Sequence, residues 1–297
     1  MHHQRGRTMA TEPSRKSSAV PESRWSRLAR LGSLAGGVAG NMLAEGARQF
    51  AQGKRPQLQQ LLLTPANAHR VADQLAQLRG AAMKVGQLLS MDAGDLLPPA
   101  LAEILSRLRA DAVPMPMSQV VSVLNANWGD GWDRHFEQFS FTPVAAASIG
   151  QVHFGQRKDG RQVAVKIQYP GIRRSIDSDV DNVATLLRVS GLLPKSLDIT
   201  PLLIEAKRQL HDEADYRREG ACMMQFASLL ADTDEFVVPV MHDDLTTENI
   251  LAMTRLDGIA VEALGHLAQA TRNRLVGQLF RLLFREIFEF RLIQTDP

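Results

Sequence analysis

Apolar residues in the first half of the chain recur at the spacing of amphipathic helices. One such series lies between residues 65 and 90 and consists of Val71, Leu75, Leu78, Ala82, Val85 and Leu89. Because these positions are three or four residues apart, they predict one long helix with a single apolar face. Pro98 and Pro99 precede a second helix, and a third begins near Ser118. Residues 57–135 are therefore predicted to be mostly helical.

The period of the apolar pattern shortens after residue 135, which predicts strands. Strands are expected at 139–142, 149–154, 161–168, 236–241 and 249–254, and helices at 172–190, 201–231 and 262–290. The second and third strands are joined by Lys158-Asp159-Gly160, in which Asp-Gly is a hairpin signal. The order of these elements resembles that of a protein-kinase N-lobe that leads into its C-lobe.

Positive charge is concentrated at the start of the chain. Residues 1–56 hold ten basic and three acidic residues, so they carry a net charge of +7 and the rest of the chain carries −5. Nucleic-acid binding needs cations clustered on a folded face, so it is not expected here. Residues 1–24, rich in Ser, Arg, Pro and Glu, are predicted to be a disordered basic leader suited to an anionic membrane surface.

Residues 25–56 form a Gly-rich segment with two open interpretations. Gly32, Gly36 and Gly40 recur every fourth residue, a pattern typical of closely packed or membrane-associated helices. A flexible linker is the alternative, because each glycine in a helix interior costs about 1 kcal/mol. The longest apolar stretch, 31–44, has 14 residues. A helix that spans a bilayer needs roughly 18 to 20, so no spanning helix is predicted.

A strand lysine and a turn of small residues are the first candidates for chemistry. Val163-Ala164-Val165-Lys166 matches the kinase strand whose lysine binds nucleotide phosphates, although an edge strand with a solvated lysine would look the same. Where kinases have a Gly-rich loop, this chain has Ala145, Ala146, Ala147 and Ser148. The alanine Cβ atoms keep the backbone amides farther from phosphate than glycine would, and a packing turn is the alternative role.

Acidic residues follow at two later points of the chain. The segment from Glu213 to Glu219 is charge-dense, which is typical of a solvated helix face. A kinase N-lobe also needs a helix glutamate to orient its strand lysine, and Glu213 has the corresponding place in the order of elements. Asp296, which follows the last predicted helix, has the place of the catalytic-loop aspartate.

Six ordered motifs together resemble the UbiB/AarF family of atypical kinases, which is linked to ubiquinone biosynthesis. They are Lys84-x-Gly86-Gln87, the turn 145–148, the segments 163–171 and 173–179, Glu213-x-Asp215 and the residues 294–297. The resemblance covers residues 25–297 and implies an α+β fold, with a protein-kinase-like N-lobe, an N-terminal helical extension that bears the KxGQ motif, and the start of a C-lobe. The expected parts are a leader at 1–24, a Gly-rich membrane-associated segment at 25–56, the extension at 57–135, the N-lobe at 136–258 and a truncated C-lobe at 259–297.

The resemblance assigns the KxGQ motif to a cover over the active site. Lys84, Gly86 and Gln87 belong to this cover, and Lys84 and Gln87 are expected beside Glu213. The strand lysine also needs a helix glutamate, so the partner of Glu213 stays open between Lys84 and Lys166. The cover takes the place of a peptide substrate, which argues against phosphorylation of proteins.

Nucleotide and metal are implied by the same resemblance. Lys166 would bind the nucleotide phosphates together with the turn Ala145–Ser148, Asp296 would be the catalytic aspartate, and Asp215 would be a second acidic position near the site. The family binds ATP or ADP with Mg²⁺ and hydrolyses ATP. Its two further metal ligands follow the catalytic aspartate, so they are expected beyond Pro297 and none is expected within this chain.

The expected function is that of an atypical kinase-like ATPase that supports ubiquinone biosynthesis at a membrane. The alternative is a non-catalytic nucleotide- or lipid-sensing scaffold, a pseudokinase, in a membrane-associated quinone-biosynthesis complex. Expected partners are nucleotide, an anionic membrane, isoprenoid quinone precursors and ubiquinone-biosynthesis proteins, and a homodimer stays open. The expected location is cytoplasmic and peripherally associated with the inner membrane, and the single Cys222 favours a reducing compartment.

Overall fold

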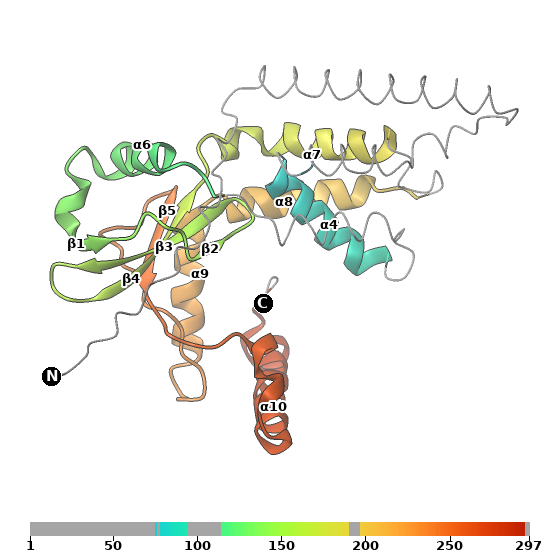
Figure 1. Ribbon diagram of the computed structural model, residues 1–297. Coiled ribbons are helices and arrows are strands. Elements are labelled where there is room, and N and C mark those ends of the chain that lie inside the picture. The colour runs from blue at the N-terminus through green and yellow to red at the C-terminus, as the bar shows by residue number, and fades with distance from the viewer. Residues whose placement is uncertain (1–74, 76–77, 94–113, 190–196, 295–297) are drawn as a thin grey trace, which may run out of the picture. The chain divides into compact units, whose positions relative to one another are not determined.

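The computed structural model describes residues 75, 78–93, 114–189 and 197–294, which fold into two units (Figure 1). The first unit contains the described residues up to Trp132, together with 140–153, 167–189 and 197–214, and the second contains 133–139, 154–166 and 215–294. The predicted leader, the Gly-rich segment, the helix after Pro98-Pro99 and Asp296 all lie outside the described residues.

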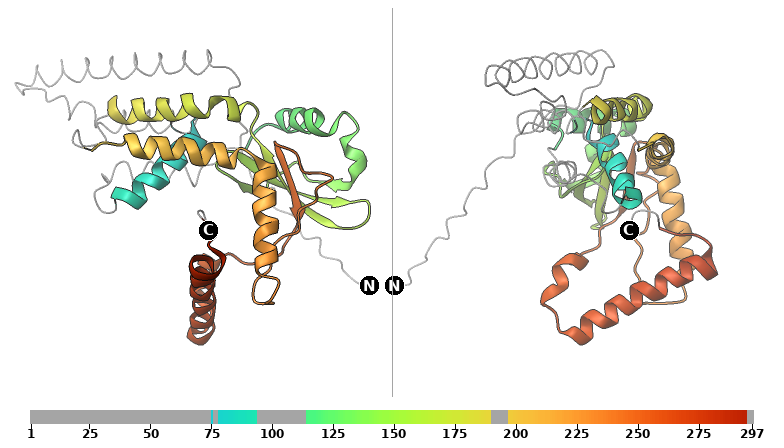
Figure 2. Two further views of the ribbon diagram at one scale, coloured as in Figure 1. Left: turned by 180° about the vertical axis from the view of Figure 1, so that it is seen from behind. Right: turned by 90° about the vertical axis from the view of Figure 1, so that its right-hand side faces the viewer.

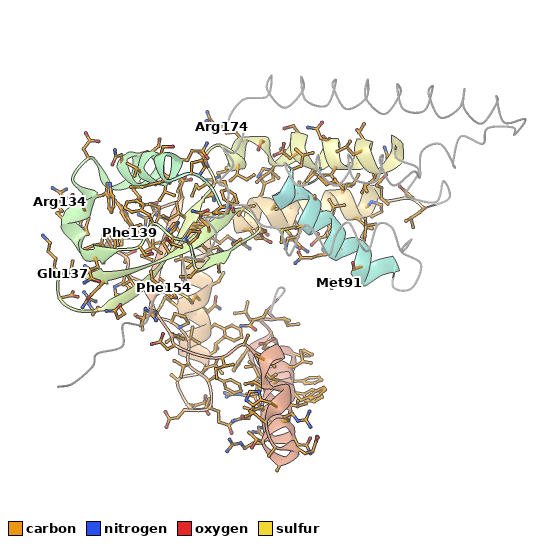
Figure 3. All side chains as sticks on the ribbon, viewed as in Figure 1. Met91, Arg134, Glu137, Phe139, Phe154 and Arg174 are labelled. Atoms are coloured by element: carbon orange, nitrogen blue, oxygen red, sulfur yellow. The ribbon has the colours of Figure 1, made fainter. Side chains whose placement is uncertain are left out.

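Three helices form the core of the first unit. They are α4 (Arg79–Ala93), α7 (Ile172–Val189) and α8 (Thr200–Glu213), and each packs against the other two (Figures 1 and 2). The predicted apolar face is buried through Ala82, Val85 and Leu89 of α4 and through Leu78, which directly precedes this helix. Met91, labelled near the end of α4 in Figure 3, is 80% exposed. The predicted amphipathic helix is therefore confirmed in its described part.

A chain of hydrogen bonds between buried polar groups joins two more elements of the first unit. These are α6 (Met117–Trp128) and the first half of β3 (Gly150–Arg157). The amide N–H of Met115, just before α6, donates to Gln151 Oε1 at 2.9 Å, and Gln151 Nε2 lies 2.8 Å from His153 Nε2. His153 Nδ1 lies 2.8 Å from the carbonyl oxygen of Ser140, which can only accept, so Nδ1 carries the proton.

The second unit is built on an antiparallel sheet with the strand order β1-β3-β4-β5. Its strands are β1 (Phe136–Phe139), the second half of β3, most of β4 (Gln162–Gln168) and β5 (Ile250–Thr254). The predicted hairpin between β3 and β4 is confirmed, and its Gly160 has a φ of +86° that favours glycine. Phe154 of β3, labelled in Figure 3, lies beneath the guanidinium group of Arg255, 4.2 Å from the ring centroid.

Two predicted strands differ from the structure. The strand predicted at 139–142 is wrong, because β1 ends at Phe139 and begins at the buried Phe136, which pairs with Arg157. The segment 236–241 forms no strand and contributes only the isolated bridge of Met241 with Met253. Pro239 lies in that segment and has no N–H to donate, so a regular ladder is interrupted there.

The single helix predicted at 201–231 is two helices, α8 and α9 (Tyr216–Leu229). Asp215 separates them with non-helical backbone angles (φ −103°, ψ 91°), and its carboxylate accepts the N–H of Arg218 at 3.1 Å. A carboxylate that caps the next helix competes with continuation of the previous one, which is the physical reason for the break. α9 then packs against β5 within the second unit.

The long helix predicted at 262–290 is also divided. A 3₁₀ segment, η3 (Val261–His266), precedes α10 (Gln269–Phe284), and a π-helical segment, η4 (Arg285–Phe290), follows it. Leu267 and Ala268 have extended backbone angles, with ψ of 156° and 142°, so the first segment cannot continue into α10. α10 buries none of its residues within the described part of the chain.

The buried His153 predicts a pH dependence of stability. Burial lowers the pKa of His153, more than its bond to Ser140 raises it. Below about pH 6.5 the unfolded chain therefore takes up a proton that the folded protein does not, and the free energy of unfolding falls by up to about 1.4 kcal/mol per pH unit. Urea unfolding between pH 7.5 and 5.5 should show this loss in the wild type and a shallower slope in His153→Gln. Some slope should remain, because burial also lowers the pKa of His242. Equal slopes for both proteins would contradict the assignment.

Candidate functional site

The first cluster of predicted site residues is an ion pair between Lys84 and Glu213 within the first unit. Lys84 lies on α4 with its side chain only 5% exposed, and Glu213, the last residue of α8, is 24% exposed. The second carboxylate oxygen of Glu213 accepts the hydroxyl of Ser148 at 2.6 Å. A buried ammonium group is costly unless it is paired, so this carboxylate holds α4, α8 and the turn together. Of the two pairings left open for Glu213, the structure has the one with Lys84.

Gly80 brings α4 into direct contact with the same turn. It lies four residues before Lys84, and the two therefore share one face of the helix. A Cβ at Gly80 would lie 2.9 Å from the carbonyl oxygen of Ser148 and 3.2 Å from Ile149 Cγ2. Only glycine leaves room for this approach. Gly80 was not among the predicted site residues, because the spacing of glycines does not reveal what they touch.

The turn 145–148 is a closed β-hairpin. Ala145 and Ala146 form β2, whose exposed residues pair with Val152 and Gln151 of β3. The N–H of Ala147 donates to the carbonyl oxygen of Gly150 at 2.9 Å. A Gly-rich loop offers such amides to phosphate, whereas this amide is bonded within its own turn. The side chain of Ser148 is in turn bonded to Glu213.

The second cluster surrounds Lys166 within the second unit. Its ammonium group lies 2.6 and 2.9 Å from the two carboxylate oxygens of Glu219 on α9. The same group lies 4.8 Å from the ring centroid of the buried Tyr216, a cation–π contact. The strand lysine is thus oriented by a helix glutamate, but by Glu219, which was not among the predicted site residues. The sequence feature that could have identified Glu219 is Asp215, because an N-cap at Asp215 places Glu219 in the first turn of a new helix.

The remaining predicted residues have plainer surroundings. Gln87 is half-buried on α4, and the carbonyl oxygen of the buried Gly86 accepts the hydroxyl of Ser90 at 2.9 Å. Asp215 caps α9, as described above. In the part of the chain that the structure describes, no three His, Cys, Asp or Glu side chains are grouped so as to hold a metal ion. None of the described helices is long and apolar enough to cross a bilayer.

Comparison with known proteins identifies the family. The profile of the ABC1 atypical kinase-like domain matches residues 107–297. The protein named "Atypical kinase COQ8, mitochondrial" from Saccharomyces cerevisiae is 42% identical over 282 residues, which cover 95% of this chain and 56% of that protein. "Atypical kinase COQ8B, mitochondrial" from Rattus norvegicus is 44% identical over 280 residues, 94% of this chain and 53% of the rat protein. "Atypical kinase coq-8, mitochondrial" from Caenorhabditis elegans is 41% identical over 285 residues, 94% of this chain and 38% of the worm protein.

One solved structure is also similar. It is the complex of Rv3197 with erythromycin from Mycobacterium tuberculosis, whose chain is 35% identical in sequence. The match covers 71% of this chain and 54% of the mycobacterial chain, with a TM-score of 0.48.

These observations define a kinase-like domain, in which an antiparallel sheet carries a lysine that a helix glutamate orients. The chain belongs to the ABC1 atypical kinase-like family, and the resemblance to UbiB/AarF proteins is confirmed. The predicted fold, a kinase-like N-lobe with part of a C-lobe, is confirmed as well. The chain spans about half the length of the yeast and rat relatives.

The close contact of α4 with the turn predicts opposite effects for two glycine substitutions. Gly80→Ala adds a methyl group 2.9 Å from a backbone oxygen, so the helix must shift and the free energy of unfolding should fall by about 1 to 3 kcal/mol. Gly277→Ala is the matched control on α10, where a Cβ would meet no atom within 4 Å, and it should raise stability by up to about 1 kcal/mol. Urea unfolding measures both. A neutral Gly80→Ala would show that the turn does not confine α4.

The burial of Lys84 predicts that removing Glu213 costs more unfolding free energy than removing Lys84. Glu213→Gln leaves the buried ammonium without the countercharge of Glu213 and should cost about 3 to 5 kcal/mol of unfolding free energy. Lys84→Met should cost less, because Glu213 is partly exposed and keeps its bond to Ser148. Lys207→Met removes a pair with the exposed Asp181 in which Lys207 itself is partly exposed, and it should cost at most about 1 kcal/mol. Chemical denaturation of the three variants measures the order of these losses of unfolding free energy. Equal losses for Glu213→Gln and Lys207→Met would contradict the prediction.

Proposed function

We propose that this chain forms the nucleotide-binding part of an atypical kinase-like ATPase that supports ubiquinone biosynthesis. The observation that carries the proposal is the ion pair of Lys166 with Glu219, since a strand lysine oriented by a helix glutamate is how kinases hold nucleotide phosphates. Relatives named atypical kinases support the kinase-like class. Their COQ8 names are the reason for assigning the chain to ubiquinone biosynthesis.

The surroundings of Lys166 suit a phosphate ligand. Its side chain is 18% exposed, and the bonds to Glu219 take up two of its three N–H donors. Glu219 and the ring of Tyr216 together limit the positions of the ammonium group, so little rotamer entropy is left to lose when a phosphate binds. The sequence-based assignment of Ala145, Ala146, Ala147 and Ser148 to nucleotide, and of Asp296 to catalysis, is kept as part of the proposal.

Magnesium would supply the neutralisation of charge on the phosphate oxygens when it is bound with nucleotide. The described residues offer no cluster of ligands for it, so we derive no step through the metal. What the described residues of this chain contribute is the orientation of Lys166 by Glu219.

The KxGQ helix α4 is proposed to act as a cover that excludes peptide substrates. Two contacts within the first unit support this role: Gly80 touches the backbone of the turn 145–148, and Lys84 shares Glu213 with Ser148. A helix fixed in this way, through a buried charge, is expected to open rarely. Small molecules, rather than proteins, are then the proposed substrates.

A non-catalytic, nucleotide- or lipid-sensing scaffold is the second candidate function. The observation that favours it is the closed hairpin at 145–148, in which the amide of Ala147 is already bonded to Gly150.

For either function we propose peripheral attachment to an anionic membrane, supported by the net charge of +7 on residues 1–56. The cytoplasmic location next to the inner membrane, isoprenoid quinone precursors and other ubiquinone-biosynthesis proteins as partners, and a homodimer also remain proposals.

Nucleotide titration of the full-length protein tests the proposed function. Mg²⁺-dependent binding of ATP or ADP, measured by calorimetry, should weaken about tenfold or more in Lys166→Met, which removes the phosphate-binding charge. Lys207→Met, which removes a partly exposed charge of α8, is the matched control and should bind like the wild type. A wild type that binds no nucleotide, or equal affinities in the two variants, would overturn the proposal. ATP turnover that is lost in Asp296→Asn favours the enzyme, whereas binding without turnover favours the scaffold.

A further inference from the structure

We propose that Gln168 is a positioning residue that fixes the Glu213 carboxylate by holding the backbone at the end of α8. Gln168 is the last residue of β4 and is 3% exposed. Its Nε2 donates to the carbonyl oxygen of Ala214 at 3.0 Å. Ala214 is buried and directly follows Glu213, so the side-chain amide is bonded next to the residue that binds both Lys84 and Ser148.

Two side chains replace the helical hydrogen bond that is lost where α8 ends. In a continuous helix the Ala214 carbonyl would accept the N–H of Arg218, four residues later. In the structure the Arg218 N–H donates to the Asp215 carboxylate, and the Ala214 carbonyl accepts from Gln168. The donor and the acceptor both keep a partner although the helix stops. Gln168 therefore supplies a hydrogen-bond donor to a backbone carbonyl at the end of α8, as Asp215 supplies an acceptor to a backbone N–H at the start of α9.

The end of α8 has a particular need for such an anchor. The last turn of a helix has carbonyl groups without intrahelical partners and is the part that frays first. Glu213 lies in this turn, and its negative charge is unfavourable beside the negative end of the helix dipole. The N–H of Ala214 donates to the carbonyl oxygen of Leu210 at 2.9 Å, and the carbonyl oxygen of Ala214 accepts from Gln168. Both sides of Ala214 are thus held, and Glu213 keeps a fixed place opposite Lys84.

A second buried glutamine of the same unit offers a matched control. Gln151 is 1% exposed and bonds to Met115 and His153, not to α8. Gln168→Met and Gln151→Met both remove a buried amide and keep the side-chain length. A general loss of stability should accompany both substitutions, because each leaves a buried backbone group without its bond. Only Gln168→Met should affect Glu213.

The test measures the coupling of Lys84 with Glu213 in three backgrounds. The variants Lys84→Met, Glu213→Gln and their combination form a double-mutant cycle by urea unfolding, made in the wild type, in Gln168→Met and in Gln151→Met. The coupling, expressed as a ratio of folding constants, should fall about tenfold or more in Gln168→Met and stay within about twofold in Gln151→Met. An unchanged coupling in Gln168→Met, or an equal fall in both backgrounds, would overturn the proposal.

Hydrogen exchange of the single variants covers the case in which the combined variants do not fold. Amides of the last turn of α8, from Leu210 to Ala214, should exchange about tenfold faster in Gln168→Met when their rates are compared with those of α7 in the same variant. In Gln151→Met this ratio of rates should stay that of the wild type, and an unchanged ratio in Gln168→Met would overturn the proposal. The link from Glu213 to the cover rests on the proposed function, but neither measurement uses nucleotide. A wild type that fails to bind ATP would therefore refute the proposed function without touching this result.

Discussion

The charge of Lys84 is the constraint on which the first unit depends. Its ammonium group lies on the face of α4 that also carries Gly80, in a helix whose neighbouring residues Ala81 and Val85 are buried. An unpaired charge in such a place would cost several kcal/mol, so a carboxylate has to reach it from another element. Glu213 does so from the end of α8, and its second oxygen holds Ser148. The packing of α4, α8 and the turn is thus determined by one shared carboxylate.

The break between α8 and α9 gives each of the two lysines its own acidic partner. Glu213 ends one helix and pairs with Lys84, whereas Glu219 lies in the first turn of the next helix and pairs with Lys166. The two glutamates are six residues apart in the sequence, so in one uninterrupted helix their side chains would point to different sides of the same axis. With the break, the kinase-like pair of Lys166 and Glu219 does not compete with the pair that holds the KxGQ helix.

Periodicity and motifs were sufficient for much of the fold and for part of the site. The apolar spacing on α4, the Asp-Gly hairpin and the strand that ends near Lys166 are all found in the structure. Predictions failed where one residue overrides a regular pattern. Asp215 caps a new helix within a segment that has continuous helical periodicity, and Pro239 interrupts a segment that has strand composition.

The sequence by itself determined the class of protein, the helical and strand character of most segments, and the identity of Lys84, Lys166 and Glu213 as candidate site residues. It did so because propensity and spacing act over a few residues, and because the family motifs are continuous in the chain. Only the tertiary structure decided that Lys84 forms an ion pair with Glu213, that Lys166 forms one with Glu219, and that Gln168 donates a hydrogen bond to the carbonyl oxygen of Ala214. These partners are brought together by packing between elements distant in sequence, and the burial that decides which charge must be paired does not exist until the elements have packed.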